Sequence, residues 1–159
     1  MGIELDIYKS FDFINRNLKN YYVSSNFTYT NSDVTLSAKQ EEKFSSNHRA
    51  LQGLSPMVFN ATLGYDNTDG RSVNFSYNKM SDRIRKVGLK NGVQEYPDQY
   101  EIPPHILDFT YQERLTDGLD MRFKARNLID GNIVWIEGDN VTKRYKAGRS
   151  YEISLSYKY

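Results

Sequence analysis

Apolar and polar residues alternate with a period of two along most of the chain. At the C-terminal end, the apolar positions Tyr151, Ile153, Leu155, Tyr157 and Tyr159 alternate with Glu152, Ser154, Ser156 and Lys158. Successive side chains of a strand point to opposite faces, so this segment predicts a strand with one apolar and one polar face. The same pattern predicts six more strands, near residues 3–8, 21–29, 57–66, 73–78, 107–112 and 119–126. The expected fold is all-β and antiparallel, with about seven up-and-down strands.

The connections between the predicted strands alternate between short and long. FINRNLKN, NTDGR and TDG are the short connections, whereas residues 35–56, 81–104 and 130–149 form long polar ones. Outer-membrane barrels have short turns at one end and long loops at the other. Tyrosines also gather near the predicted strand ends, where a lipid-facing strand meets the membrane interface. Both features favour part of a transmembrane β-barrel.

Composition allows this interpretation and excludes some others. The mean hydropathy of −0.71 and 38% hydrophobic content are typical of soluble proteins. Barrel strands also look hydrophilic on average, because every second residue faces the lumen. There is no apolar run long enough for a membrane helix, and MGIELDIYKS has no secretion-signal pattern. A net charge of +1 predicts no nucleic-acid partner.

Two alternatives remain from the residues alone. A small self-contained barrel of about eight strands would serve adhesion or anchoring, and residues 132–146 are the candidate for its eighth strand. A soluble β-sandwich or lipocalin-like binder would instead turn the apolar face inward. Its core would consist of Phe59, Leu63, Phe75, Phe109, Phe123 and Leu155.

Five segments, in order, resemble the carboxy-terminal barrel of TonB-dependent outer-membrane receptors. They are residues 48–67, 70–88, 96–115, 119–130 and 148–159. The most specific pieces are LQGLSP before a strand, ARNLID after a basic strand, and the aromatic end of the last strand. The resemblance covers nearly all of residues 1–159 and implies the last seven strands of a barrel of about 22 strands. No plug-domain sequence is present in these residues.

The resemblance also implies a function and a set of partners. Receptors of this family import iron-siderophore complexes, haem, cobalamin or similar scarce nutrients across the bacterial outer membrane. The expected partners are outer-membrane lipid, the plug domain, the remaining barrel strands, the barrel-assembly machinery and, through a part outside this chain, the TonB system. The family's role is transport, so neither a cofactor nor an enzymatic activity is expected.

Three groups of residues are candidates for functional roles. The first group consists of charged residues that are expected to face the lumen: Asp108, Asp120, Arg122, Lys124, Arg126, Glu152 and Lys158. They are expected either to contact a plug or guide anionic cargo, or to form cross-strand ion pairs. Possible loop contacts to a ligand are His48, Arg49, Tyr96, Tyr100 and Trp135. By resemblance, the assembly machinery reads Tyr151, Ile153, Leu155, Tyr157 and Tyr159.

Catalytic and metal-binding patterns are absent from the sequence. There is no cysteine, and the two histidines, His48 and His105, lie far apart. No Gly-rich phosphate loop and no G-x-S-x-G nucleophile context occurs. The sequence therefore predicts neither a metal site nor a catalytic site.

Overall fold

Strands dominate the computed structural model, which describes the backbone of residues 1–159 and all side chains except those of Ala38 and Lys39. About 61% of the residues lie in strands and 5% in helices. The sheets are antiparallel, and none of them closes on itself. The prediction of an all-β antiparallel fold is confirmed.

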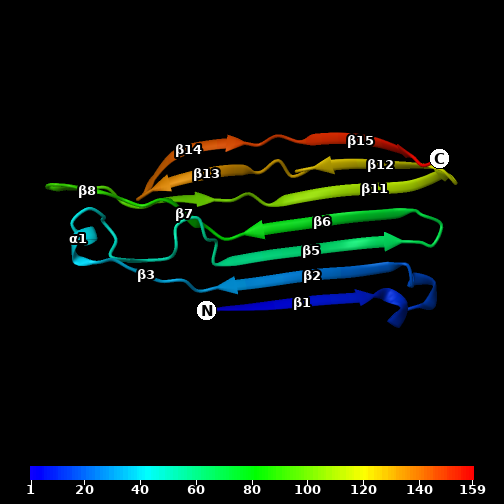
Figure 1. Ribbon diagram of the computed structural model, residues 1–159, viewed down its shortest axis with the longest axis horizontal. Helices are drawn as coiled ribbons and strands as arrows, with labels where there is room; N and C mark the ends of the chain where they lie inside the picture. The colour runs from blue at the N-terminus through cyan, green and yellow to red at the C-terminus, as the bar shows by residue number, and fades with distance from the viewer.

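Seven strands form the main sheet, in the order β1-β2-β5-β6-β11-β12-β15 (Figure 1). They are β1 (Gly2–Ser10), β2 (Tyr21–Thr30), β5 (Met57–Asp66), β6 (Ser72–Met80), β11 (Ile106–Thr116), β12 (Leu119–Arg126) and β15 (Ser150–Tyr157). Each one coincides with a segment that the period-two pattern predicts. Because spatial order follows chain order, the up-and-down topology is also confirmed.

The two ends of the main sheet differ in the length of their connections (Figure 1). At one end, β1 and β2 are joined through the short 3-10 helices η1 (Phe11–Phe13) and η2 (Arg16–Leu18). Residues 67–71 and 117–118 make the other two turns at this end. The long connections all leave from the opposite end, as the sequence predicts.

A second sheet extends the main sheet at the long-connection end. Its four strands have the order β14-β13-β10-β7. They are β7 (Arg83–Lys86), β10 (Gln99–Ile102), β13 (Asn132–Glu137) and β14 (Asn140–Lys146). Along the chain, β7 follows β6, β10 precedes β11, β13 follows β12 and β14 precedes β15. The second sheet therefore continues four neighbouring strands of the main sheet.

Residues 132–146 do not add an eighth strand to the main sheet. They form the β13–β14 hairpin, and β13 pairs with β10 through Gln99–Glu137 and Ile102–Val134. The idea that this segment closes a small barrel is therefore wrong. The backbone groups of β13 are used by the second sheet, which lies beyond the end of β12.

The remaining elements are short. Strand β3 (Val34–Thr35) pairs with β4 (His48–Arg49), and β8 (Lys90–Asn91) pairs with β9 (Gln94–Glu95). Helix α1 (Ala38–Glu41) lies between β3 and β4. No helix in the described part of the chain has the length and apolar character of a membrane span.

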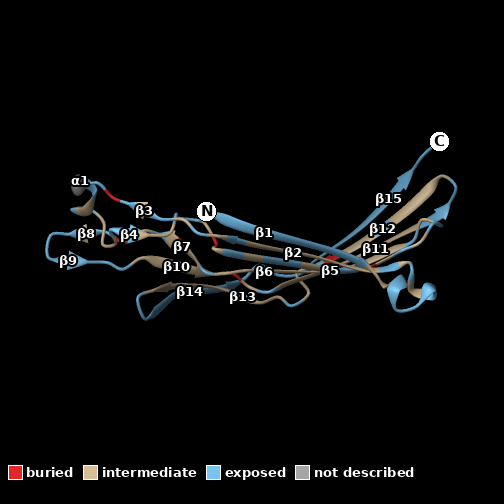
Figure 2. Ribbon diagram, turned by 90° about the horizontal axis from the view of Figure 1, so that it is seen from below, coloured by how far each residue is buried: buried red, intermediate tan, exposed pale blue. Residues whose placement is uncertain are grey.

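The main sheet is a single layer with almost no buried core (Figure 2). Among the described side chains, the buried hydrophobic ones are Leu36, Ile84 and Ala125. By contrast, Phe75 is 45% exposed and Leu155 is 65% exposed. The rings of Phe75 and Phe109 are in contact, with centroids 4.9 Å apart, but on neighbouring strands of one uncovered face. The packed core of the soluble sandwich interpretation is not found.

Gly64 makes room for an aromatic ring that crosses the sheet. The Tyr22 hydroxyl donates a hydrogen bond of 2.7 Å to Asn74 Oδ1, passing over the intervening strand β5. A Cβ added at Gly64 would lie 2.2 Å from the Tyr22 ring, which is far inside van der Waals contact. The absence of a side chain at Gly64 therefore allows three strands to be tied together on one face.

We expect Gly64→Ala to lower the free energy of unfolding by about 1–3 kcal/mol, because the added methyl group displaces the Tyr22 ring. In the double variant with Tyr22→Ala the clash disappears, so the combined loss should be smaller than the sum of the two single losses. Urea unfolding followed by circular dichroism measures these differences. Strictly additive losses would contradict the proposed role of Gly64.

Candidate functional site

One face of the main sheet carries continuous rows of apolar side chains. The register pairs successive members of one such row: Val23, Leu63, Phe75, Phe109, Ala125 and Tyr151. Phe109 also lies 6.2 Å from Phe123, measured between ring centroids. This face is therefore a broad aromatic and aliphatic surface that no other element of the described chain covers.

Tyrosines and charged side chains border this apolar face. Towards the short turns, the Tyr21 and Tyr65 rings lie 4.9 Å apart. Beyond them, Arg71 forms an ion pair with Glu113. Towards the long connections, the Tyr77 ring lies 5.9 Å from the ring of His105. The apolar surface thus gives way to polar groups at both ends.

The opposite face carries hydrogen-bonded rows of polar side chains. Asn26 Nδ2 donates to Asp6 at 2.8 Å, and Asn78 Nδ2 donates to Asn60 at 2.7 Å. Asn60 Nδ2 in turn lies 3.5 Å from Asn26 Oδ1. These side chains satisfy one another across β1, β2, β5 and β6. The two faces of one sheet therefore suit opposite solvents.

Six of the seven predicted lumen-facing charges lie on this polar face by strand parity. They are Asp108, Asp120, Arg122, Lys124, Arg126 and Glu152. Glu152 lies 3.3 Å from Arg126 and 4.0 Å from Lys124. Its side chain is 49% exposed, so each pair contributes at most about 1 kcal/mol. Cross-strand ion pairs, which the sequence analysis gave as the alternative role of these charges, are therefore present around Glu152.

The seventh predicted charge, Lys158, lies beyond the end of β15. Its backbone N–H donates to the carbonyl oxygen of Gly118 at 2.8 Å, which extends the pairing with the β11–β12 turn. Lys158 therefore lies beside the turn before β12, whereas Lys124 and Arg126 lie near the other end of that strand. It is therefore not part of the same charge cluster.

The predicted assembly residues lie on an edge of the main sheet. Strand β15 has β12 on one side and no neighbour on the other. Tyr151, Ile153, Leu155 and Tyr157 are between 64% and 71% exposed, and Tyr159 follows the strand. The strand thus offers both a free backbone edge and an apolar side.

The five predicted loop residues are dispersed over the long-connection end. His48 faces Asp33 at 3.4 Å, and the Arg49 guanidinium lies 5.2 Å from the centre of the Phe44 ring. Trp135 is in the second sheet on β13. Two of the five, Tyr96 and Tyr100, line a common cavity.

Trp135 is held in place by neighbouring charged side chains. The Arg85 guanidinium lies 3.5 Å from the centre of its ring, and the Lys143 ammonium lies 4.4 Å from it. Its indole N–H donates to Glu101 at 3.1 Å. Cation–π contacts of this kind contribute about 0.5–2 kcal/mol. Trp135 therefore stabilises the second sheet, a role that the sequence analysis did not predict.

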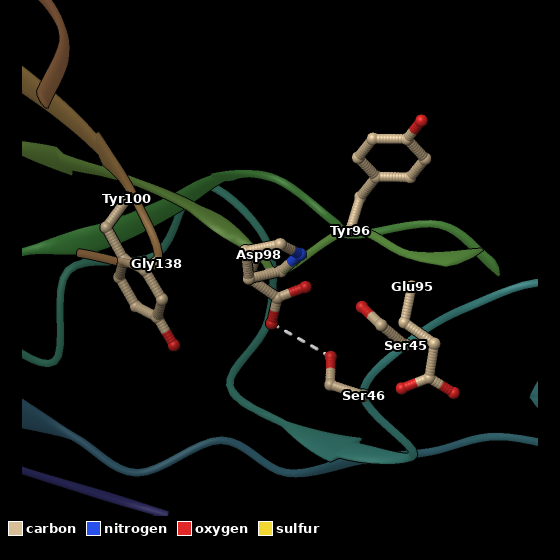
Figure 3. A pocket seen from close by; sticks show the side chains of 8 residues that line it. Ser45, Ser46, Glu95, Tyr96, Asp98, Tyr100 and Gly138 are labelled. Atoms are coloured by element: carbon tan, nitrogen blue, oxygen red, sulfur yellow. Dashed lines mark hydrogen bonds between the residues drawn. The ribbon is translucent and has the colours of Figure 1, made fainter. Parts of the chain in front are cut away.

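A cavity of about 520 Å³ lies where three long-connection segments meet (Figure 3). Its lining consists of Ser45, Ser46, Glu95, Tyr96, Pro97, Asp98, Tyr100 and Gly138. Asp98 is at its centre, where it accepts hydrogen bonds from Ser46 Oγ at 2.8 Å and from the Gly88 N–H at 2.7 Å. The sequence analysis predicted the two tyrosines but missed Ser45, Ser46 and Asp98, which carry no periodic signal.

Gly88 is the point at which two of these segments, residues 35–56 and 81–104, touch. A Cβ there would lie 2.1 Å from the Tyr96 carbonyl oxygen and 2.2 Å from Ser45 Oγ. Both distances are far below contact, and one of them is to rigid backbone. The two segments can approach this closely beside the cavity only because residue 88 has no side chain.

Neither a metal site nor a similar known protein indicates the function. Among the described residues, no group of three or more His, Asp or Glu side chains is placed to hold a metal ion. No protein-family model, curated protein or solved structure matches this chain. The function is therefore inferred from the two faces of the sheet and from the cavity.

We expect Gly88→Ala to separate the segments around the cavity and to lower the free energy of unfolding by about 1–3 kcal/mol. Amide hydrogen exchange should become faster at Tyr96 and Lys90, whose N–H groups bond to Leu89 and Lys43. Val93→Ala is the matched control, because Val93 is fully exposed in the adjoining hairpin. Unchanged exchange in Gly88→Ala would show that the segments do not depend on this contact.

Proposed function

We propose that this chain is part of the wall of a transmembrane β-barrel in the bacterial outer membrane, in a receptor of the TonB-dependent type. The observation that carries the proposal is the single-layer sheet with one exposed apolar face and one hydrogen-bonded polar face. On this proposal, the apolar face contacts lipid and the polar face lines a wet interior. The receptor imports a siderophore, haem or a similar scarce nutrient.

Strand length supports a membrane-spanning sheet. Strand β5 has 10 residues, which corresponds to roughly 33 Å at about 3.3 Å per residue. With a tilt of roughly 40°, such a strand covers about 25 Å along the membrane normal, the height of the apolar band of outer-membrane barrels. The tyrosines at both borders of the apolar face fit the aromatic belts at the two membrane interfaces.

The two edges of the main sheet support a larger assembly. Strands β1 and β15 each have one neighbour in the sheet, so each leaves a row of backbone groups unpaired. In hydrocarbon, every unpaired group costs several kcal/mol. The proposed partners of these edges are the remaining barrel strands, while the polar face meets a plug domain. TonB acts through a part of the receptor outside this chain, and barrel-assembly proteins recognise β15.

The charge pattern is consistent with a barrel wall that has no catalytic role. Several charges on the polar face form cross-strand ion pairs, such as Glu152 with Arg126. The long connections and the second sheet then form the outer rim, where recognition loops stand on a rigid scaffold. No step of the proposed function requires a covalent reaction or a cofactor.

Single-cysteine labelling tests the orientation of the sheet, because the chain contains no natural cysteine. We expect a fluorophore at Leu63→Cys or Phe75→Cys to be quenched by brominated lipids in phospholipid vesicles. A fluorophore at the neighbouring positions Thr62→Cys or Ser76→Cys should not be quenched, since these side chains lie on the polar face. Val93→Cys serves as the water-exposed control. Equal quenching on both faces, or a folded monomer in buffer without detergent, would contradict the membrane orientation.

Nutrient uptake tests the receptor part of the proposal separately. Cells without the protein are expected to grow more slowly when iron is supplied only as a ferric siderophore or as haem. Dissipating the proton gradient should abolish the same uptake in cells that have the protein. Normal growth on both iron sources would reject this class of cargo, whatever the labelling experiment shows.

A further inference from the structure

The cavity beside Gly88 holds a carboxylate that is already oriented. Both oxygens of Asp98 accept a hydrogen bond, one from Ser46 Oγ and one from the Gly88 N–H. A carboxylate has about four acceptor positions, so about two remain for a ligand. Because the two donors compensate part of its charge, Asp98 is suited to accept from neutral O–H groups.

A buried hydroxyl group without a partner lies in the same lining. Ser45 Oγ is shielded from solvent and makes no hydrogen bond within the described chain. Leaving such a group unpaired costs about 1–3 kcal/mol. This oxygen is closed off in the described conformation, so a bound ligand reaches it only if the Ser45 side chain rotates. Such a rotation on ligand binding would bring the hydroxyl group into the cavity and remove this cost.

The remaining walls are flat, largely apolar rings. Tyr96, Pro97 and Tyr100 line the cavity beside Asp98 (Figure 3). Burial and, to a smaller extent, the negative charge of Asp98 raise the pKa of the Tyr100 phenol. The phenol therefore remains protonated at physiological pH and can donate a hydrogen bond. Ring faces next to oriented polar groups are typical of small-molecule sites.

The charges of the lining disfavour anions and do not require a cation. Among the described side chains, the cavity is lined by two carboxylates, Glu95 and Asp98, and by no lysine or arginine. Glu95 lies 3.3 Å from the Lys90 ammonium, which neutralises it from outside the lining. An anionic ligand would be repelled, whereas an uncharged ligand with several O–H donors would pair with Asp98 and Tyr100.

We propose that this cavity binds an uncharged, hydroxyl-rich ligand, of which a saccharide is the simplest class. A sugar ring presents O–H groups at its rim, which can donate to Asp98. The C–H groups on its faces can pack against the tyrosine rings. Binding here does not depend on the membrane location. A role of the saccharide as cargo does rest on the proposed receptor function.

Titration of the protein in detergent micelles with glucose, N-acetylglucosamine and maltotriose tests the proposal by calorimetry. The expected dissociation constant for at least one of them is about 1 mM, as is common for a small open site. Tyr100→Phe should weaken binding about threefold to tenfold, because it removes a hydroxyl that makes no hydrogen bond to any described side chain. Tyr145→Phe, on the second sheet outside the cavity, should leave binding unchanged.

Asp98→Asn provides a second variant with nearly the same shape. It should weaken binding about tenfold or more, since an acceptor is replaced by a donor amide. Ferric citrate and choline are the comparison ligands, one anionic and one cationic. Tighter binding of either of these, no saccharide binding, or binding that neither variant weakens would overturn the proposal. The lipid-quenching result is independent of all these outcomes, so failure here leaves the membrane orientation standing.

Discussion

The backbone ladder of the seven-stranded sheet is the constraint on which the rest of the structure depends. Only Leu36, Ile84 and Ala125 are buried hydrophobic side chains within the described residues, so a packed core does not hold this chain together. Antiparallel hydrogen bonds and cross-strand side-chain pairs do so instead. Because one face of the sheet is apolar and the other is polar, the sheet is stable only where its apolar face meets an apolar environment. The proposed membrane location follows from that requirement.

Two glycines are as important to this single-layer fold as its larger residues. Gly64 lets the Tyr22 ring cross a strand and reach Asn74, which ties three strands together on the polar face. Gly88 lets the long connections 35–56 and 81–104 come into contact beside the cavity. In both places a glycine in ordinary backbone conformation is needed for space, not for a special φ angle. At these two glycines, close contact between neighbouring chain segments takes the place of core packing.

The long-connection end is built differently from the main sheet. Its stability comes from polar contacts, such as those of Trp135 with Arg85 and Glu101, and from the β7–β10–β13–β14 pairing. The cavity lies within this region, away from the apolar face. Such a division places a polar recognition surface at the end of a scaffold whose strands are aligned by backbone hydrogen bonds. Cargo recognition and membrane insertion would then be separate properties of one chain.

Residue order alone determined the seven main strands, their two faces and the unequal ends, because strand periodicity and turn length are local properties. It also placed Asp108, Lys124 and Glu152 on one face, since successive side chains along a strand point to opposite faces. Only the tertiary structure decided that β13 pairs with β10, and that Ser46 meets Asp98 across 52 positions of the chain. Such contacts depend on how irregular segments fold back on one another, and no periodic signal in the sequence encodes that.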